Sequence, residues 1–120
     1  MTTQTQHQNM LTLDADNFER EVLQSEQPVL VDFWADWCPP CKAIGPVIEE
    51  VATEFEGIAR VGKVDVDENE SLAERYAISS IPTLLFFRNG KVVNRVQGVV
   101  PKSDLTAKLT ALSERTTIQK

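Results

Sequence analysis

The feature of this sequence that most constrains its fold is a nearly continuous apolar run, Val29–Ala35, which follows Pro28 and contains a single charged residue, Asp32. Strands that are buried on both faces read as uninterrupted apolar runs, whereas strands with one wet face alternate between apolar and polar residues. We therefore expect this run to form the central strand of a sheet that is covered by helices on both sides.

The rest of the chain alternates between strand-like and helix-like patterns. Strands are expected at Met10–Leu13, Arg60–Asp67, Thr83–Arg88 and Lys91–Gln97, and helices at Asp16–Leu23, from the cysteines to Phe55, at Glu70–Tyr76 and around Leu105, Leu109 and Leu112. Asn89-Gly90 is a strong two-residue hairpin signal, and Pro46 is expected to kink the helix that contains it. The order βαβαβαββα predicts an α/β domain with a central mixed β-sheet flanked by helices on both faces.

Length and charge narrow the possible functions. At 120 residues the chain can form one domain with its own core, expected at residues 10–112 between flexible tails at 1–9 and 113–120. The net charge of −6 argues against a nucleic-acid partner, because phosphate contacts need clustered Lys and Arg. No apolar stretch approaches the ~20 residues that a membrane-spanning helix needs, and residues 1–9 lack the pattern of a secretory signal. We expect a cytoplasmic protein with no membrane partner, and we take it to be a monomer.

The cysteines of the chain, Cys38 and Cys41, stand directly after the predicted central strand in the segment Trp37-Cys38-Pro39-Pro40-Cys41. A strand-to-helix junction places Cys38 at a helix N-terminus, where unpaired N–H groups and the helix dipole stabilise a thiolate. The thiolate is the attacking species in disulfide exchange, so Cys38 is the expected nucleophile and Cys41 the expected resolving thiol. Prolines are tolerated in the first helical turn, where they make the loop rigid.

Two other uses of the cysteines fit the sequence less well. A structural zinc site needs four ligands, and beyond the cysteines the chain offers only His7, in the predicted tail. Only a metal that bridged two chains could complete such a site. A purely structural disulfide would close too short a loop to constrain the unfolded chain much. The motif therefore predicts a redox-active disulfide, with no metal and no cofactor.

The segment Val31–Lys42, with the sequence VDFWADWCPPCK, resembles the active-site segment of the thioredoxin family. Further matches follow in the family's order and extend the resemblance over residues 10–112: Pro46, Lys63, Ile81-Pro82-Thr83, Phe87-Arg88-Asn89-Gly90 and Gly98. The resemblance implies a thioredoxin fold and a protein that reduces the disulfides of other proteins. It also implies a thioredoxin reductase as the partner that returns the oxidised cysteines to the dithiol.

Asp32 is the only charge in the predicted central strand. Burial disfavours a charged carboxylate and raises its pKa, which would suit Asp32 to proton transfer near neutral pH. The alternative is a carboxylate that is satisfied by hydrogen bonds or that faces water at an edge of the sheet. The resemblance implies that Asp32 helps to deprotonate Cys41 and that Lys63 lies near it as a modulator, whereas a strand lysine by itself is most often only solvated.

An apolar surface for docking protein substrates is expected around the nucleophile. Trp37 lies on a loop, whereas Trp34 belongs to the apolar run and is expected in the core. Flat apolar patches with polar rims commonly mark protein contact sites. The resemblance implies a cis peptide bond before Pro82, which would expose the Ile81 backbone to an extended substrate. The sequence alone leaves open an ordinary proline at the start of a strand. The expected docking residues are Trp37, Pro39, Pro40, Ile81, Pro82, Gly98 and Val99.

The sequence departs from the commonest family pattern in two places. Pro39 stands where a glycine is usual, which removes an N–H donor near Cys38, so the reduction potential does not follow from the motif. Ser79-Ser80 replaces a more usual glycine before Ile81, which bears on substrate fit. Two other functions stay open at this point: oxidation or isomerisation of disulfides in an oxidising compartment, and a binding module in which the redox pair is incidental.

Overall fold

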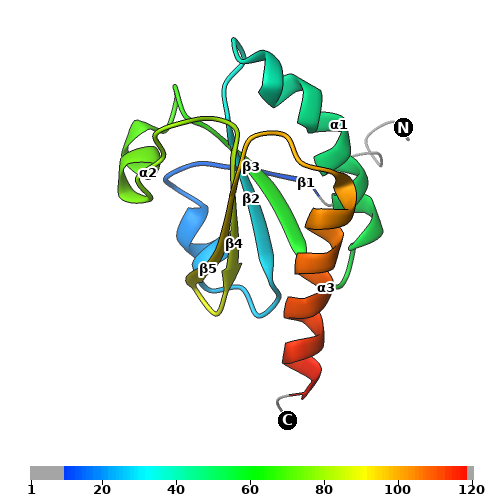
Figure 1. Cartoon of the computed structure of the whole chain (residues 1–120). Coiled ribbons are helices and arrows are strands. Elements are labelled where there is room, and N and C mark those ends of the chain that lie inside the picture. Colours follow the sequence, from blue (N-terminus) through cyan, green and yellow to red (C-terminus); the bar gives the residue numbers. More distant parts are fainter. Residues whose placement is uncertain (1–9, 119–120) are drawn as a thin grey trace, which may run out of the picture.

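A computed structural model of the protein describes residues 10–118, so the tail predicted at residues 1–9 lies outside the described residues. The strands are β1 (Met10–Leu13), β2 (Val29–Trp34), β3 (Arg60–Asp65), β4 (Thr83–Arg88) and β5 (Lys91–Gln97). The helices are the π-helical turn η2 (Glu19–Leu23), α1 (Pro39–Glu54), α2 (Glu70–Arg75) and α3 (Lys102–Ile118). Their order along the chain agrees with the order predicted from the sequence (Figure 1).

The strands form one sheet in the order β1-β3-β2-β4-β5, which places β2 at the centre, as its apolar run predicts. β1, β3 and β2 run parallel, whereas β4 pairs antiparallel with both β2 and β5. Residues Val29–Phe33 are all buried, because β2 has a strand on each side and helices over each face (Figure 1). The structure thus confirms the predicted α/β fold with a mixed sheet.

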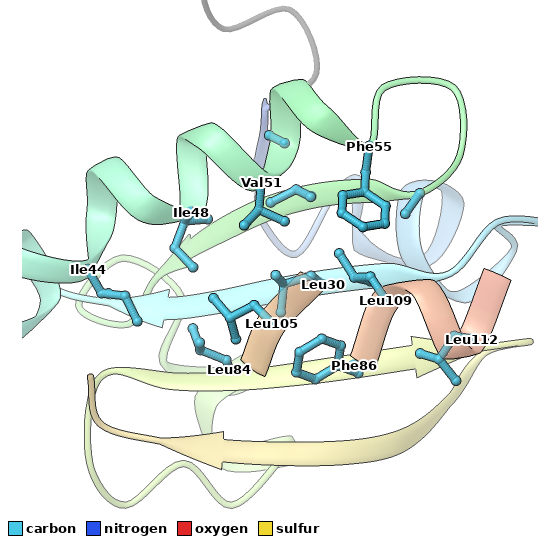
Figure 2. Packing of buried hydrophobic residues seen from close by; sticks show 13 residues of the cluster. Leu30, Ile44, Ile48, Val51, Phe55, Leu84, Phe86, Leu105, Leu109 and Leu112 are labelled. Carbon is cyan, nitrogen blue, oxygen red and sulfur yellow. The ribbon is translucent and has the colours of Figure 1, made fainter. Parts of the chain in front are cut away.

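The side chains of β2 enter two apolar layers in turn, because successive residues of a strand point to opposite faces. Leu30 belongs to the layer under α1 and α3 (Figure 2), and Val31 and Phe33 belong to the layer under η2 and α2. Asp32 has the same parity as Leu30, so its side chain lies on the α1 face of the sheet. The α1 layer also includes Ile44, Ile48, Val51, Leu84, Phe86, Leu105, Leu109 and Leu112.

The turn between β4 and β5 forms where the hairpin signal predicts it. Asn89 and Gly90 have positive φ angles of 56° and 79°, the combination that a two-residue type I′ turn requires. A Cβ atom at Gly90 would also lie 2.9 Å from the Leu23 carbonyl oxygen at the end of η2. Glycine therefore serves both the turn and the close packing of the hairpin against η2.

Some details differ from the sequence predictions. Trp34, expected in the core, is only partly buried because it ends β2 at the rim of the sheet. α1 runs as one helix through Pro46, and the kink expected there stays a prediction. α3 continues to Ile118, past the boundary expected at residue 112, because the apolar spacing stops before the helix does. Within residues 10–118, no helix combines the length and the apolar character needed to cross a membrane.

Candidate active site

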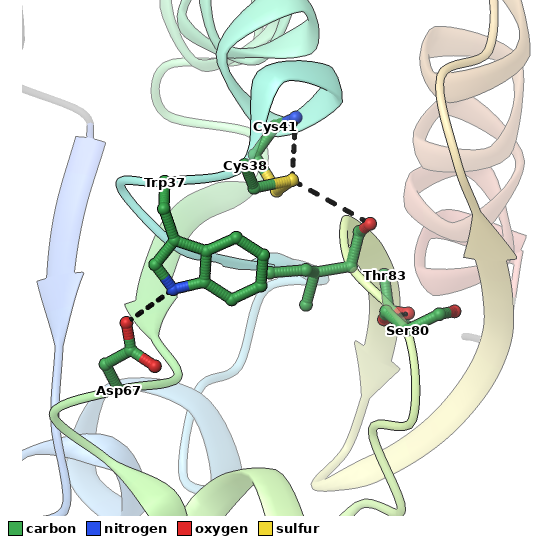
Figure 3. The surroundings of a disulfide bond; sticks show 7 residues. Trp37, Cys38, Cys41, Asp67, Ser80 and Thr83 are labelled. Atoms are coloured by element: carbon green, nitrogen blue, oxygen red, sulfur yellow. Dashed lines mark hydrogen bonds between the residues drawn. A yellow bond between two sulfur atoms is a disulfide. The ribbon is translucent and has the colours of Figure 1, made fainter.

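The cysteines form a disulfide at the junction between β2 and α1. Cys38 is the N-cap of α1, and its Cα lies 5.3 Å from that of Cys41 in the first turn. The Cys41 N–H donates to Cys38 Sγ at 3.2 Å (Figure 3). Pro39 and Pro40 occupy the first helical positions, where their missing N–H groups cost no helical bond. A backbone donor and the positive end of the helix dipole therefore face the Cys38 sulfur.

Both cysteines are almost enclosed by their neighbours. Cys38 is 3% exposed and Cys41 is 2% exposed, and Ala35 and Ile81 pack against them. The Ile81 carbonyl oxygen lies 3.9 Å from Cys38 Sγ (Figure 3). The sulfur carries no proton while it is in the disulfide, so this is a contact that a reduced Cys38 thiol could use as a hydrogen bond. The peptide bond between Ile81 and Pro82 is cis, as the family resemblance implied.

Hydrogen bonds hold the segment that carries Ile81 on both sides. The buried Thr83 donates its Oγ1 hydroxyl to the Ser80 carbonyl at 2.6 Å. The Gly98 N–H donates to the Pro82 carbonyl at 2.9 Å, which ties this segment to the residue after β5. Gly98 has a φ of 86°, a conformation that favours glycine. The Ile81 backbone is thereby held beside the disulfide.

Asp32 is a buried acid with an unpaired oxygen. It is 2% exposed, and its Oδ1 atom has no hydrogen-bond partner in the described part of the chain. Burial raises the pKa of Asp32 from 3.8 to about 7, and the positive charge of Lys63 opposes the rise. Because β2 is the central strand, the alternative of a carboxylate at a sheet edge does not hold. A carboxyl group that titrates near neutral pH can both accept and return a proton under ordinary conditions.

Lys63 lies beside Asp32 on the neighbouring strand. The two are register partners in the β2–β3 pair. The Lys63 ammonium stands over the Trp34 ring, 4.3 Å from its centroid, which is a cation–π arrangement. The strand register places Lys63 beside Asp32, as the resemblance implied. Among the described residues, no group of three or more His, Cys, Asp and Glu side chains could hold a metal ion.

The residues expected to dock substrates differ in their exposure. Trp37 is 66% exposed and Val99 is 55% exposed, as a contact surface requires. Pro82 is buried, so it can contribute little apolar surface. The exposed members of the set are Trp37, Pro39, Pro40 and Val99, the partly buried ones are Ile81 and Gly98, and the buried one is Pro82.

The sequence analysis did not identify Asp67, which holds Trp37 in place. The Trp37 indole Nε1 donates to Asp67 Oδ2 at 2.8 Å (Figure 3). Asp67 follows β3, and Trp37 follows the parallel neighbour β2. The carboxyl ends of adjacent parallel strands meet at one edge of a sheet, which is the signal that could have paired the two residues. An apolar hollow beside the indole is lined by Val66, Ala73, Ile78, Ser79, Ser80 and Ile81.

Comparisons with known proteins show the family of the chain. The thioredoxin family model matches residues 9–111. A thioredoxin from Chlorobaculum thiosulfatiphilum is 50% identical over 93 residues, which cover 78% of this chain and 86% of the relative. A thioredoxin from Acidithiobacillus ferridurans is 49% identical over 98 residues, which cover 82% and 91%. Thioredoxin 1 from Nostoc sp. is 51% identical over 92 residues, which cover 77% and 86%. The chain therefore belongs to the thioredoxin family, and with its Cys38–Cys41 disulfide it is a thiol–disulfide oxidoreductase.

Proposed function

We propose that the protein reduces disulfides of other proteins, with Cys38 as the attacking thiol and Cys41 as the resolving thiol. The observation that carries this proposal is the hydrogen bond from the Cys41 N–H to Cys38 Sγ at the start of α1. A donor at a helix N-terminus stabilises negative charge on the sulfur that it faces, which lowers the pKa of a thiol there and favours the reactive thiolate.

The reaction proceeds in two exchanges that conserve atoms and electrons. The Cys38 thiolate attacks one sulfur of the substrate disulfide, forms a mixed disulfide and releases the other substrate sulfur as a thiolate. The Cys41 thiolate then attacks Cys38 Sγ, which breaks the mixed disulfide and releases the second substrate sulfur. Two electrons have then passed to the substrate, and the protein is left with the Cys38–Cys41 disulfide, the state in this structure.

Asp32 is assigned the proton transfer that the second exchange needs, because Cys41 must lose its proton before it attacks. Burial raises the Asp32 pKa to about 7, so the group is partly ionised near neutral pH and can accept a proton. Lys63 is assigned a modulating role, because its charge lowers the Asp32 pKa against the larger effect of burial. These roles rest on the burial of Asp32 on the α1 face and on its register partnership with Lys63.

Protein substrates are expected to dock on the exposed apolar surface around Cys38. The Trp37 ring and the Val99 side chain provide apolar contact area, and the Ile81 backbone lies beside the attacking sulfur. An extended substrate segment could pair with that backbone as a strand pairs with a sheet edge. The proposed docking surface consists of Trp37, Pro39, Pro40, Ile81, Gly98 and Val99, with Pro82 shaping the backbone.

We also propose the partner and setting of the reaction. Oxidised Cys38–Cys41 would be returned to the dithiol by a thioredoxin reductase, and the protein would work as a monomer in the cytoplasm without a bound metal or cofactor. The support is the family membership and the cysteine content, since the only cysteines of the chain form the redox pair. A reducing compartment keeps such a pair in the form that donates electrons.

Insulin-disulfide reduction tests this function, with NADPH and a thioredoxin reductase as the electron source. The parent protein should consume NADPH in step with insulin reduction, and Cys38→Ser should abolish turnover. A Cys41→Ser variant should instead accumulate as a mixed disulfide with its substrate, because nothing resolves it. A parent protein without reductase-dependent activity would overturn the proposal. A reduction potential measured against glutathione would separate a reductase from an oxidant of thiols.

A further inference from the structure

The segment that lies against the disulfide begins at the capped end of α2. Tyr76 is the C-cap, and Ala77 follows with a left-handed φ of 55°. The Ala77 N–H donates to the Glu74 carbonyl at 3.1 Å, and the Ile78 N–H donates to the Ala73 carbonyl at 2.9 Å. This pair of bonds is a Schellman cap, which reverses the chain at the end of a helix and fixes its exit direction. Alanine adopts the left-handed conformation less readily than glycine does, so the turn needs support from its surroundings.

Arg95 of β5 supplies that support. Its Nη2 atom donates to the Tyr76 carbonyl oxygen at 2.8 Å, a group that the two bonds of the cap do not use. Arg95 pairs with Leu85 in the β4–β5 ladder, and Leu85 is buried in the apolar layer that Tyr76 packs against. Residues paired across strands share a face of the sheet, so the Arg95 side chain rises on the face where α2 lies. A guanidinium from the edge strand thus holds the last residue of the α2 cap.

A few residues after the α2 cap, the chain passes beside the attacking sulfur, Cys38 Sγ. Figure 1 shows the chain passing from α2 to the start of β4. Residues Ile78–Ile81 line the apolar hollow beside Trp37, and the Ile81 carbonyl lies 3.9 Å from Cys38 Sγ. Thr83 holds the far end of this segment through the Ser80 carbonyl. Arg95 holds the near end, so a loss of its bond would free the segment on the side where Thr83 gives no support.

We propose that Arg95 is a positioning residue for protein substrates: by bonding the Tyr76 carbonyl, it sets the Ile78–Ile81 segment in the conformation that a docked substrate meets. This inference rests on the proposed function, since it concerns how tightly that site engages proteins. The hydrogen bond that Arg95 makes goes to the Tyr76 carbonyl and not to either sulfur. Its loss should therefore weaken the engagement of protein substrates and leave the exchange chemistry of Cys38 and Cys41 in place.

Three variants test this role in insulin reduction. Arg95→Met keeps much of the apolar stem but removes the donors, Arg95→Lys keeps a charged donor, and Lys91→Met removes a charge from the same strand without touching the α2 cap. Arg95→Met should raise KM for insulin by roughly threefold to tenfold, the effect of one hydrogen bond of ordinary strength. Its kcat, and its rate with the small disulfide DTNB, should stay within about twofold of the parent values. Arg95→Lys should recover part of the KM, and Lys91→Met should match the parent.

The outcomes separate the possible failures. An Arg95→Met protein with parental KM would overturn the inference, as would a Lys91→Met protein with an equally raised KM, which would indicate a general effect of charge. An equal loss with insulin and with DTNB would place the effect at the disulfide itself and would also overturn it. A parent protein that fails to reduce insulin would refute the proposed function together with this role. A parent that reduces insulin normally while Arg95→Met is unchanged refutes the role of Arg95 alone.

Discussion

Asp32 on β2 and Asp67 just after β3 carry the same carboxyl group on adjacent parallel strands, yet they differ in burial and in hydrogen bonding. Asp32 is buried in the central strand, its Oδ1 has no hydrogen-bond partner among residues 10–118, and it titrates near neutral pH because burial raises its pKa to about 7. Asp67 is exposed after β3 and accepts the Trp37 indole N–H at 2.8 Å. The first environment suits a group that exchanges protons, and the second suits a group that holds a side chain in position.

The difference separates two requirements of disulfide exchange. Proton transfer needs a group whose charge can change, which a low-dielectric site provides at a cost in stability. Docking of proteins needs an apolar surface that is fixed in position and exposed to solvent. The hydrogen bond from Trp37 to Asp67 holds the indole in place while the ring stays exposed. Substitution at each aspartate should therefore affect different measurements.

The largest expected effect is on stability, through Asp32. Between about pH 4 and pH 7 the folded protein keeps a proton on Asp32 that the unfolded chain has released, so stability falls as the pH rises through this window. The rise in pKa from 3.8 to about 7 corresponds to roughly 4 kcal/mol of destabilisation above pH 7. Asp32→Asn does not titrate, so its stability relative to the parent should increase by up to this amount between pH 4 and pH 8.

Urea unfolding of the two oxidised proteins at pH 4 and pH 8 measures this effect. The informative quantity is the change in their stability difference with pH, because the cost of placing an amide in this site is the same at both values. Asp67→Asn serves as the matched control at the exposed carboxylate. If the stability difference between Asp32→Asn and the parent were independent of pH, Asp32 would not titrate in this window.

The next largest effect is on turnover, again through Asp32. Loss of a general base typically costs at least about a hundredfold when it acts in the rate-limiting step, and less when another step shares control. We expect Asp32→Asn to slow insulin reduction by about tenfold or more at pH 7 and to flatten the pH dependence of the rate near the Asp32 pKa. Stopped-flow reduction of insulin from pH 5 to pH 9 would measure both. Rates equal to those of the parent across that range would remove Asp32 from the mechanism.

The sequence predicts the buried environment of Asp32 better than the exposed environment of Asp67 and Trp37. The central strand, its single charge and the Asn89-Gly90 turn are local patterns, and the structure contains each of them where it is expected. The bonds that complete the docking side join residues 30 apart in sequence for Trp37 and Asp67 and 19 apart for Arg95 and the Tyr76 carbonyl. Their partners depend on strand order and on how the α2 cap directs the chain, which a local pattern does not encode.

A smaller effect is expected from the Trp37 ring, on the docking side of the comparison. Trp37→Ala removes a large exposed aromatic surface, and we expect KM for insulin to rise by about tenfold, or about 1.4 kcal/mol, an effect just below that of a binding hot spot. The reaction with DTNB should change by less than about twofold, because a small disulfide needs little docking surface. Steady-state kinetics with both substrates measure the contrast. An equal loss with both would mean that Trp37 acts on the sulfur rather than on docking.

The smallest effect isolates the hydrogen bond that holds the ring. Asp67→Ala removes the acceptor of the Trp37 N–H and leaves the indole in place, so KM for insulin should rise by about threefold, in keeping with one exposed hydrogen bond. Asp67→Asn keeps an acceptor oxygen and should stay close to the parent. Trp37→Phe removes the donor, and if the bond carries the effect, adding Asp67→Ala to Trp37→Phe should cause no further rise. If the two substitutions raised KM additively, Asp67 would act through its charge and not through the bond to Trp37. Asp32 and Asp67 would then differ in burial but not in the kind of role proposed for Asp67.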